Sequence, residues 1–389
     1  MQDILSMKQG LNDKRLVDIC GIQYGCPFDA SLFSTSSSEG MPLIRIRDVK
    51  GGQTETYYSG EYSPEFIIRK GDYLIGMDGE FNIAPWQSED ALLNQRVCKI
   101  YTKSQDVVIR YVYRFLQKEL KKIEDETPFV TVKHLSAKRL NQVYIPVPTI
   151  AEQEKIVAVL DCLSGIIEKK KQQLKELDNL AQSVFYEMFG DPVENDKGWK
   201  TINIENICSS IVRGPFGSAL KKEFFVEQAP TTYKVYEQKH AIQKSADIGT
   251  YFIDAERFQT LKRFEVVPGD VIMSCSGTIG EFFVIPEGAE RGIINQALLK
   301  YTLNDSIDLT YFLYVMEWVK ENFDKKGTGL QNIGSVGTIK KTKISFPPLT
   351  LQQDFASKIE SIEKQKELIA QSIKEVETLF NSRIELYFN

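Results

Sequence analysis

Two short runs of the sequence alternate polar side chains with apolar ones. Arg45 and Arg47 alternate with isoleucines, so on a β-strand both guanidinium groups would project from one face. Lys234 and Tyr236 take the same places in the second run. Because the planar fork of arginine suits phosphates and guanine edges, we expect these four side chains to contact nucleic acid. A solvated strand face is the plain alternative.

Small polar loops follow two apolar runs that each begin after a Gly-Asp pair. The loops span residues 76–82 and 274–280, and they contain Asp78, Ser276 and Thr278. Glycines in both loops permit a close approach to bases or to a phosphate backbone. The three polar residues are therefore candidate DNA contacts, although a tight turn explains the composition equally well.

Two further polar segments precede the last predicted strand of each half of the chain. Lys133 and His134 occupy the first segment, and Gln331 and Asn332 occupy the second. Backbone amides there can bind phosphate, and a glutamine or asparagine amide can pair with an adenine edge. Ordinary loop chemistry remains the alternative interpretation.

Catalytic and metal-binding signatures are missing from the sequence. Residues 345–349 contain Pro-Pro but lack the flanking residues of an adenine-methyltransferase pocket, and the glycine-rich residues 327–334 lack the lysine of a phosphate loop. Six cysteines form no C-x-x-C pair, and neither histidine has a partner at ligand spacing. We therefore expect a binding protein that is not an enzyme and holds no metal.

Composition indicates an ordinary globular protein. The chain has 389 residues, 42% of them hydrophobic, with 48 basic and 53 acidic side chains and a net charge of −5. Most of the acidic excess falls in two long predicted helices, so the remainder is almost neutral and can accommodate DNA. No apolar run approaches the roughly 20 residues of a membrane span, and no secretory leader is evident. A cytoplasmic protein with no membrane partner is expected.

The elements that must position these residues form an internal repeat with a period of about 200 residues. A Gly-Asp pair at 71–72 returns at 269–270, and Asn-Gln at 94–95 returns at 295–296. Each copy begins with short β-like runs and turns, followed by a helical segment. The expected strands and helices are residues 43–49, 73–77, 96–101, 271–274 and 282–285, and residues 107–122 and 309–323.

Each copy ends in a long helix with a clear start. Residues 149–152 and 350–353 both fit the capping box, in which a threonine N-cap and a later Glu or Gln satisfy each other's amides. Counting alternately four and three residues from Ile156 and from Phe355 gives almost entirely apolar positions, as in a coiled coil. We expect the two helices to pair antiparallel about an approximate two-fold axis.

The expected fold is therefore α+β, with two mixed α/β domains separated by two long antiparallel helices. The expected boundaries are residues 1–148, 149–190, 191–348 and 349–389. Several apolar residues of the first helix lie off the seam and are expected to form a surface for partner proteins: Val157, Val159, Ile166, Leu180 and Phe185.

This organisation resembles the specificity subunit of type I restriction–modification systems. Residues 145–161 read Ile-Pro-Val-Pro-Thr-Ile-Ala-Glu-Gln-Glu-Lys-Ile-Val-Ala-Val-Leu-Asp, and residues 346–353 echo the start of that motif. The resemblance covers essentially the whole chain. The second copy departs from the pattern by carrying Gln352 where the first has a glutamate.

The resemblance implies what the chain binds and what binds to it. Each domain would be a target-recognition domain for one half of a split duplex DNA sequence, and the helices would set the half-site spacing. Two methyltransferase subunits, which use S-adenosylmethionine, would dock on the helices, and restriction subunits would complete a cleaving complex. The chain itself would catalyse nothing.

Two other functions remain open on the residues alone. The helices can form the rod of a scaffold whose end domains bind proteins, or the chain can be the detached recognition part of a fused DNA methyltransferase. DNA titration at several salt concentrations separates the scaffold, because only counterion release gives a steep salt dependence. Methyl transfer by the isolated chain would identify the fused enzyme.

Overall fold

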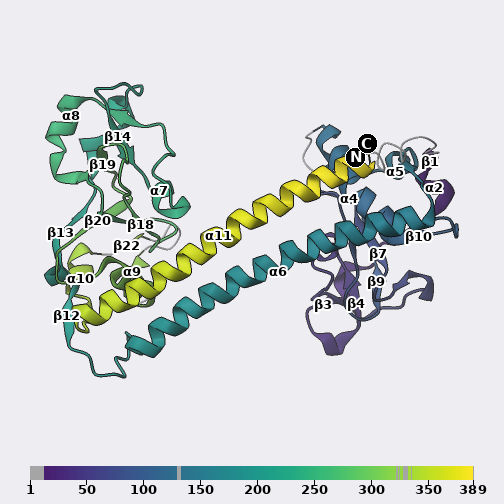
Figure 1. Cartoon of the computed structure of the whole chain (residues 1–389), viewed down its shortest axis with the longest axis horizontal. Coiled ribbons are helices and arrows are strands. Elements are labelled where there is room, and N and C mark those ends of the chain that lie inside the picture. Colours follow the sequence, from purple (N-terminus) through teal and green to yellow (C-terminus); the bar gives the residue numbers. More distant parts are fainter. Residues whose placement is uncertain are drawn as a thin grey trace. The chain divides into compact units, whose positions relative to one another are not determined.

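The computed structural model of the protein describes residues 13–128, 133–320, 323, 325–326, 332–333 and 335–388. The chain divides into two compact units (Figure 1). The first unit contains Met1–Gln172 and Ala370–Asn389, and the second contains Gln173–Ile369. Both long helices are therefore shared, since each contributes one part to each unit.

Two sheets and a two-stranded ribbon build the first unit. One sheet is antiparallel in the order β2-β10-β7-β8, and the other has the order β3-β5-β4-β9-β6 with β4 and β9 parallel. The ribbon pairs β1 with β11. The strands are β1 (Asp13–Arg15), β2 (Cys20–Tyr24), β3 (Phe33–Ser34), β4 (Met41–Ile44), β5 (Tyr57–Tyr58), β6 (Ile67–Ile68), β7 (Tyr73–Gly76), β8 (Asn82–Pro85), β9 (Ala91–Leu93), β10 (Val97–Thr102) and β11 (Tyr144–Pro146).

Helices pack against the first of these sheets. The main core joins α2, β7, β10 and α4 to the start of α6 and the end of α11, where Leu160 and Phe388 are buried. Burial of this apolar surface provides the main stabilisation of the unit. The helices are α2 (Leu16–Ile19), α3 (Ile46–Val49), α4 (Ile109–Glu126), α5 (Ala137–Asn141), α6 (Ile150–Phe189) and α11 (Leu349–Phe388).

The second unit repeats this arrangement. Its antiparallel sheet has the order β13-β20-β17-β18, and its second sheet has the order β15-β14-β19-β16 with β14 and β19 parallel. The strands are β12 (Thr201–Asn203), β13 (Cys208–Arg213), β14 (Tyr233–Tyr236), β15 (Phe252–Ile253), β16 (Glu265–Val266), β17 (Val271–Ser274), β18 (Phe282–Val284), β19 (Gly292–Ile294), β20 (Leu298–Leu303), β21 (Lys325–Lys326), β22 (Asn332–Ile333) and β23 (Lys343–Ser345).

In the second unit, an aromatic core packs the end of α6 and the start of α11 against α9. Phe185 and Phe189 near the end of α6 pack with Tyr311 of α9 and Phe355 of α11. The Tyr311 hydroxyl donates to the carbonyl of Ser345, as the Tyr111 hydroxyl of α4 donates to Pro146 in the first unit. The shorter helices are α7 (Gln238–Gln243), α8 (Ala255–Thr260), α9 (Leu309–Val319) and α10 (Val336–Lys341).

The predicted seam is confirmed in both units. The early part of α6 shares the first core with the late part of α11, and the late part of α6 shares the second core with the early part of α11, so the helices are antiparallel. Every seam position counted from Ile156 and from Phe355 is buried or half-buried. Even the polar seam residue Lys366 is half-buried, with its ammonium group 2.8 Å from Asp178.

The helix starts differ from each other. Thr149 and Glu152 form the predicted capping box, with the Thr149 amide 3.0 Å from the Glu152 carboxylate. The second predicted box is wrong, because α11 already begins at Leu349. Thr350 therefore lies inside the helix and cannot be its N-cap.

A buried glutamine fixes both helix starts. The side chain of Gln153 accepts from the Val108 amide at 2.9 Å and donates to the carbonyls of Asp106 and Pro148. Gln352 does the same in the second unit, where it accepts from Asp308 and donates to Pro347. Both side chains are fully buried, so these contacts tie each helix to the loop before α4 or α9.

Candidate nucleic-acid interface

The predicted strand over residues 43–49 ends early. Strand β4 stops at Ile44, Arg45 is the N-cap of α3, and Arg47 lies within that helical turn. The cause is Asp48, whose carboxylate accepts a hydrogen bond from the Arg45 amide at 2.8 Å and thereby caps the turn. Arg45 and Arg47 are both exposed, but the prediction that they share one strand face is wrong.

The second pair is buried. Lys234 is 2% exposed, with its ammonium group 3.1 Å from the Glu290 carboxylate, and Tyr236 is fully buried with its hydroxyl donating to the Glu290 carbonyl. Burial raises the pKa of Tyr236 to about 12. The exposed strand face predicted for Lys234 and Tyr236 is therefore wrong.

Strand register explains why the two runs were matched incorrectly. Ile44 lies beside Leu93 on the parallel strand β9, and Tyr236 lies beside Ile294 on β19. Leu93 and Ile294 each precede the repeated Asn-Gln pair, so Tyr236 corresponds to Ile44. The residue that corresponds to Arg45 is then Glu237, the N-cap of α7.

Asp78 and His134 meet at the surface of the first unit. They form an isolated β-bridge, and His134 Nδ1 lies 2.5 Å from Asp78 Oδ1. Arg96, which precedes β10, completes the cluster with its Nε 3.6 Å from Asp78 Oδ2. The side chains of Arg96 and His134 are about half exposed (52% and 44%), so this cluster is open to a ligand.

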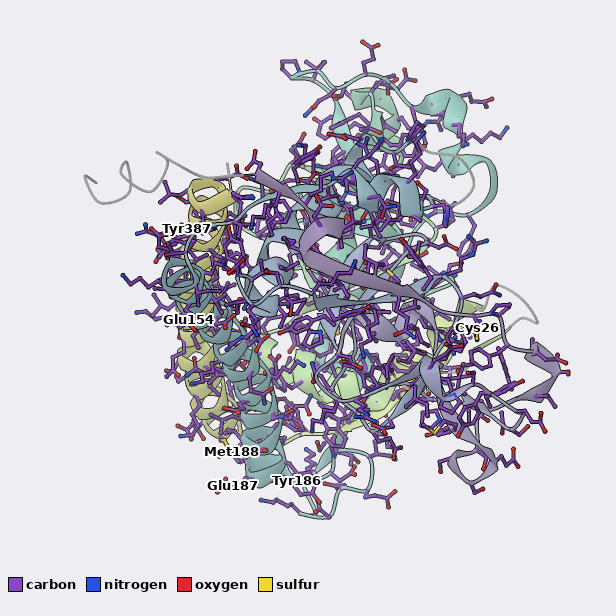
Figure 2. All side chains as sticks on the ribbon, turned by 90° about the vertical axis from the view of Figure 1, so that its right-hand side faces the viewer. Cys26, Glu154, Tyr186, Glu187, Met188 and Tyr387 are labelled. Atoms are coloured by element: carbon purple, nitrogen blue, oxygen red, sulfur yellow. The ribbon has the colours of Figure 1, made fainter. Side chains whose placement is uncertain are left out.

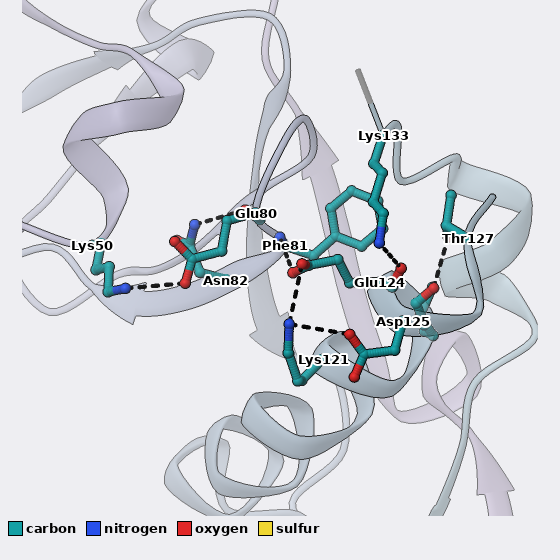
Figure 3. A network of polar contacts seen from close by, with 10 residues as sticks. Lys50, Glu80, Phe81, Asn82, Lys121, Glu124, Asp125, Thr127 and Lys133 are labelled. Atoms are coloured by element: carbon teal, nitrogen blue, oxygen red, sulfur yellow. Dashed lines mark hydrogen bonds and ion pairs between the residues drawn. The ribbon is translucent and has the colours of Figure 1, made fainter. Parts of the chain in front are cut away.

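Lys133 lies next to the cluster but its ammonium group is turned away. Its Nζ donates to the carbonyl of Glu124 at the end of α4, at 2.5 Å (Figure 3). The Glu124 carboxylate accepts from the Phe81 amide and pairs with Lys121. A lysine at a helix C-terminus satisfies a free carbonyl and interacts favourably with the negative end of the helix dipole, so the contact of Lys133 with Glu124 is structural. The DNA contact predicted for Lys133 stays a prediction.

The corresponding loop of the second unit contains Ser276 and Thr278. The side chain of Gln238, the first residue of α7, donates to the carbonyl of Ser276 and, at 3.2 Å, to that of Thr278. Ser276 is half-buried and Thr278 is exposed. Gln331 lies outside the described residues. Asn332 pairs with Lys326 between β22 and β21, and the prediction for its side chain stays a prediction.

Several residues of these surfaces escaped the sequence interpretation. Arg96 directly follows the repeated Asn-Gln pair, and this position in the repeat is the signal that could have identified it. In the second unit Phe216 is 62% exposed, and the guanidinium of Arg213 lies 5.0 Å from its ring centre. The loop after β13 packs tightly, because a Cβ at Gly214 would lie 1.9 Å from the Asn295 carbonyl oxygen.

The loop after β2 is the matching feature of the first unit. Cys26 bridges Asn94, and a Cβ on Gly25 would lie 2.1 Å from the Asn94 carbonyl oxygen. Figure 2 shows Cys26 on the opposite side of this unit from Glu154 of α6 and Tyr387 of α11. The loop next to Asn94 is thus well separated from the two long helices.

The predicted partner surface on α6 is only partly exposed. Val159, Ile166 and Leu180 are 38%, 36% and 47% exposed, but Val157 and Phe185 are buried in the two cores, and their assignment to the outer face is wrong. The reason is that the helices bury a second face against α4 and α9, in addition to the seam.

Ion pairs and aromatic rings hold that second face. Arg114 of α4 pairs with Asp161 of α6 in the first unit, while Phe185 stacks on Tyr311 and Tyr314 of α9 in the second.

The described residues contain no cluster of potential metal ligands. Among them, none of the helices is long and apolar enough to cross a membrane.

Comparison with known proteins identifies relatives along the whole chain. The family model for the type I restriction modification DNA specificity domain matches residues 8–179 and again residues 196–378. The EcoBI specificity subunit of Escherichia coli is 28% identical over 381 residues, which cover 89% of this chain and 79% of the relative. A putative type I specificity subunit of Haemophilus influenzae is 25% identical over 330 residues, which cover 79% of this chain and 80% of the relative.

Solved structures share the fold. The S subunit of a type I restriction–modification system from M. genitalium superposes with a TM-score of 0.54 at 13% identity, covering 99% of this chain and 98% of the other. A chain from a study of complex assembly in a type I system gives a TM-score of 0.60 at 16% identity, covering 97% of both chains. At these identities the likeness concerns the fold alone.

Proposed function

The chain belongs to the type I restriction–modification DNA specificity family, and on that premise we propose that each of its units binds one half of a split duplex DNA target. It is the DNA sequence-specificity subunit of such a system. One observation carries the assignment of a half-site to each unit. The loops at Asp78 and at Ser276 are held by equivalent strands in the two units but present different side chains.

DNA and methyltransferase subunits are the partners of this family. We assign two methyltransferase subunits to the long helices, where Val159, Ile166 and Leu180 expose apolar side chains. These subunits bind S-adenosylmethionine and methylate adenine, and restriction subunits join a complex that also cleaves DNA. The specificity chain contributes recognition and no catalytic group.

A domain exchange tests the assignment of half-sites. The complex of this chain with its methyltransferase subunits is expressed in a methylation-free host, and its target is mapped by methylation-sensitive sequencing. A chimaeric chain, in which residues 198–343 come from a relative, is mapped in the same way. We expect a split target, of which one half changes in the chimaera. A change in both halves, or a continuous target, contradicts the proposal.

A salt titration gives an independent test. Binding of the complex to its target duplex is measured at several salt concentrations and compared with a scrambled duplex. Neutralisation of phosphates predicts a linear fall of log K with log salt for both duplexes, with tighter binding to the target throughout. A flat salt dependence contradicts duplex recognition and favours a protein-binding scaffold.

A further inference from the structure

Equivalent backbone hydrogen bonds hold the loop at residues 76–82 in the first unit and the loop at residues 274–280 in the second, and we call these bonds the frame. The Met77 amide donates to the Arg96 carbonyl at 2.9 Å in the first unit, and the Cys275 amide donates to the Ala297 carbonyl at 2.8 Å in the second. Arg96 and Ala297 therefore occupy the same place. An alanine suffices for this backbone hydrogen bond, so the bond does not require the arginine side chain.

The backbone at Arg96 is strained. Its φ is 70°, in the left-handed region that residues with a Cβ rarely adopt, whereas Ala297 is not among the residues with positive φ. Such conformations persist only where the surroundings impose them, and they gather at binding sites. The frame thus holds a half-exposed arginine in a conformation that the fold itself does not need.

Counting protons shows which arginine donors remain available. His134 Nδ1 lies 2.5 Å from Asp78 Oδ1 and 3.3 Å from Arg96 Nη1, but one ring nitrogen cannot both donate and accept. The shorter contact to a carboxylate assigns the proton to Nδ1, which donates to Asp78. Arg96 Nη1 then has no acceptor there, and its Nε faces the other carboxylate oxygen at 3.6 Å.

The result is an arginine whose Nε side forms an ion pair with Asp78, while Nη1 and Nη2 have no acceptor in the described part of the chain. Among the described residues, no acceptor other than Asp78 faces the Arg96 guanidinium, since the contact with His134 joins two donors. The Nη1 and Nη2 groups form the pair of parallel donors that matches O6 and N7 of guanine in the major groove. The negative charge of Asp78 attracts the Nε side of the guanidinium and so favours an outward direction for Nη1 and Nη2.

We propose that Arg96 reads a guanine in the half-site bound by the first unit, with Asp78 and His134 as positioning residues. The inference rests on the proposed function and adds the base and the residue that recognises it. A phosphate contact is the competing role for an exposed arginine. A phosphate contact requires only positive charge, whereas guanine recognition requires the two Nη groups to point at the base edge in a fixed orientation.

The test uses the complete complex with its methyltransferase subunits and a randomised duplex library. Wild type, Arg96→Gly, Arg96→Lys and Asp78→Asn are each put through selection, and the affinities for the selected duplex and its single-base-pair variants are then titrated. Glycine removes the fork and relieves the positive φ. Arg69→Ala is the matched control, because Arg69 is exposed before the opposite end of β7.

We expect the wild-type target to contain a G·C pair whose preference falls about tenfold to a hundredfold in Arg96→Gly. The other half-site should keep its preferences. Arg96→Lys should retain affinity better than preference, and Asp78→Asn should lower the preference at the same base pair by a smaller factor. Arg69→Ala should leave the preference unchanged.

Each contrary outcome has its own meaning. An equal loss of affinity for all duplexes in Arg96→Gly identifies a phosphate contact and overturns the inference, as does a preference identical to wild type. If Arg96→Gly does not assemble, an unchanged preference in Arg96→Lys overturns it. A wild-type complex that selects no split target contradicts the proposed function itself.

Discussion

The two units hold their loops with the same backbone hydrogen bonds and fill them with different side chains. Asp78 corresponds to Ser276 and Arg96 to Ala297, and the cap of the turn after the parallel strand is Asp48 in one unit and His240 in the other. The residues next to the long helices correspond closely, as Gln153 and Gln352 and as Tyr111 and Tyr311 do. The comparison indicates that one backbone frame can hold different loop residues.

The largest expected effect concerns the aromatic packing that distinguishes the second unit. Phe185→Ala should lower the free energy of unfolding of that unit by about 3–5 kcal/mol, because it leaves a cavity among rings. Urea unfolding with hydrogen-exchange mass spectrometry resolves the units. Glu187→Ala, at an exposed site two residues later, is the control and should change stability little. Similar values for both variants would contradict the packing.

Equal effects in both units are expected where the frame is shared. Gln153→Leu and Gln352→Leu should each destabilise their own unit by about 2–4 kcal/mol, because buried amides and carbonyls lose their partners. The same unfolding experiment measures both, with exposed Glu154→Ala as the control. A loss in one unit only would show that the two helix starts are not equivalent.

A smaller effect should separate the exposed helix surface from the buried one. Leu180→Glu should weaken methyltransferase association about tenfold, or about 1.4 kcal/mol, while leaving unfolding unchanged. Analytical ultracentrifugation of the mixed subunits gives the affinity. Asn179→Glu introduces the same charge one residue earlier and is the control. Equal affinities for the two variants would remove Leu180 from the interface.

The smallest effect is a pH dependence confined to the second unit. Burial lowers the pKa of His240, whose Nδ1 accepts from the Glu237 amide at 2.8 Å, and nearby Lys234 acts in the same direction. The folded unit therefore binds the proton more weakly than the unfolded chain does. The stabilisation that neutral His240 gives to the folded unit is therefore fully present above pH 6.5, and it is lost as the pH falls below that value.

A substitution isolates this contribution. His240→Asn keeps a side-chain oxygen that can accept from the Glu237 amide but has no group that titrates between about pH 5 and 8. Hydrogen exchange around α7 should then become less sensitive to pH than in wild type. An unaltered pH profile in the variant would assign the effect to another group.

Periodicity and repetition predicted the parts of the fold that depend on local pattern. The seam from Ile156 and the cap at Thr149 needed only residues close together in the sequence, and the repeat needed only the same short motifs in the same order. All three are confirmed. Burial of Lys234 was not predictable in this way, because its partner Glu290 is far along the chain. The seam count also could not show that α9 covers Phe185.

The recognition surface was less predictable than the frame. The loops at Asp78 and Ser276 were found from their glycines, but Arg96 is brought to the site by a backbone bond to Met77 and by contacts with Asp78 and His134. Arg45 was misplaced because a capping aspartate three residues later ended the strand. The contacts of Arg96 depend on strand pairing rather than on composition.

The division of the helices between the units determines the order in which they form during synthesis. The second unit uses one continuous stretch, whereas the first needs both Met1–Gln172 and Ala370–Asn389. Its core lacks Ile384 and Phe388 until those residues leave the ribosome, about 200 residues and roughly 10–40 s later at usual translation rates. The unit translated first is thus completed last.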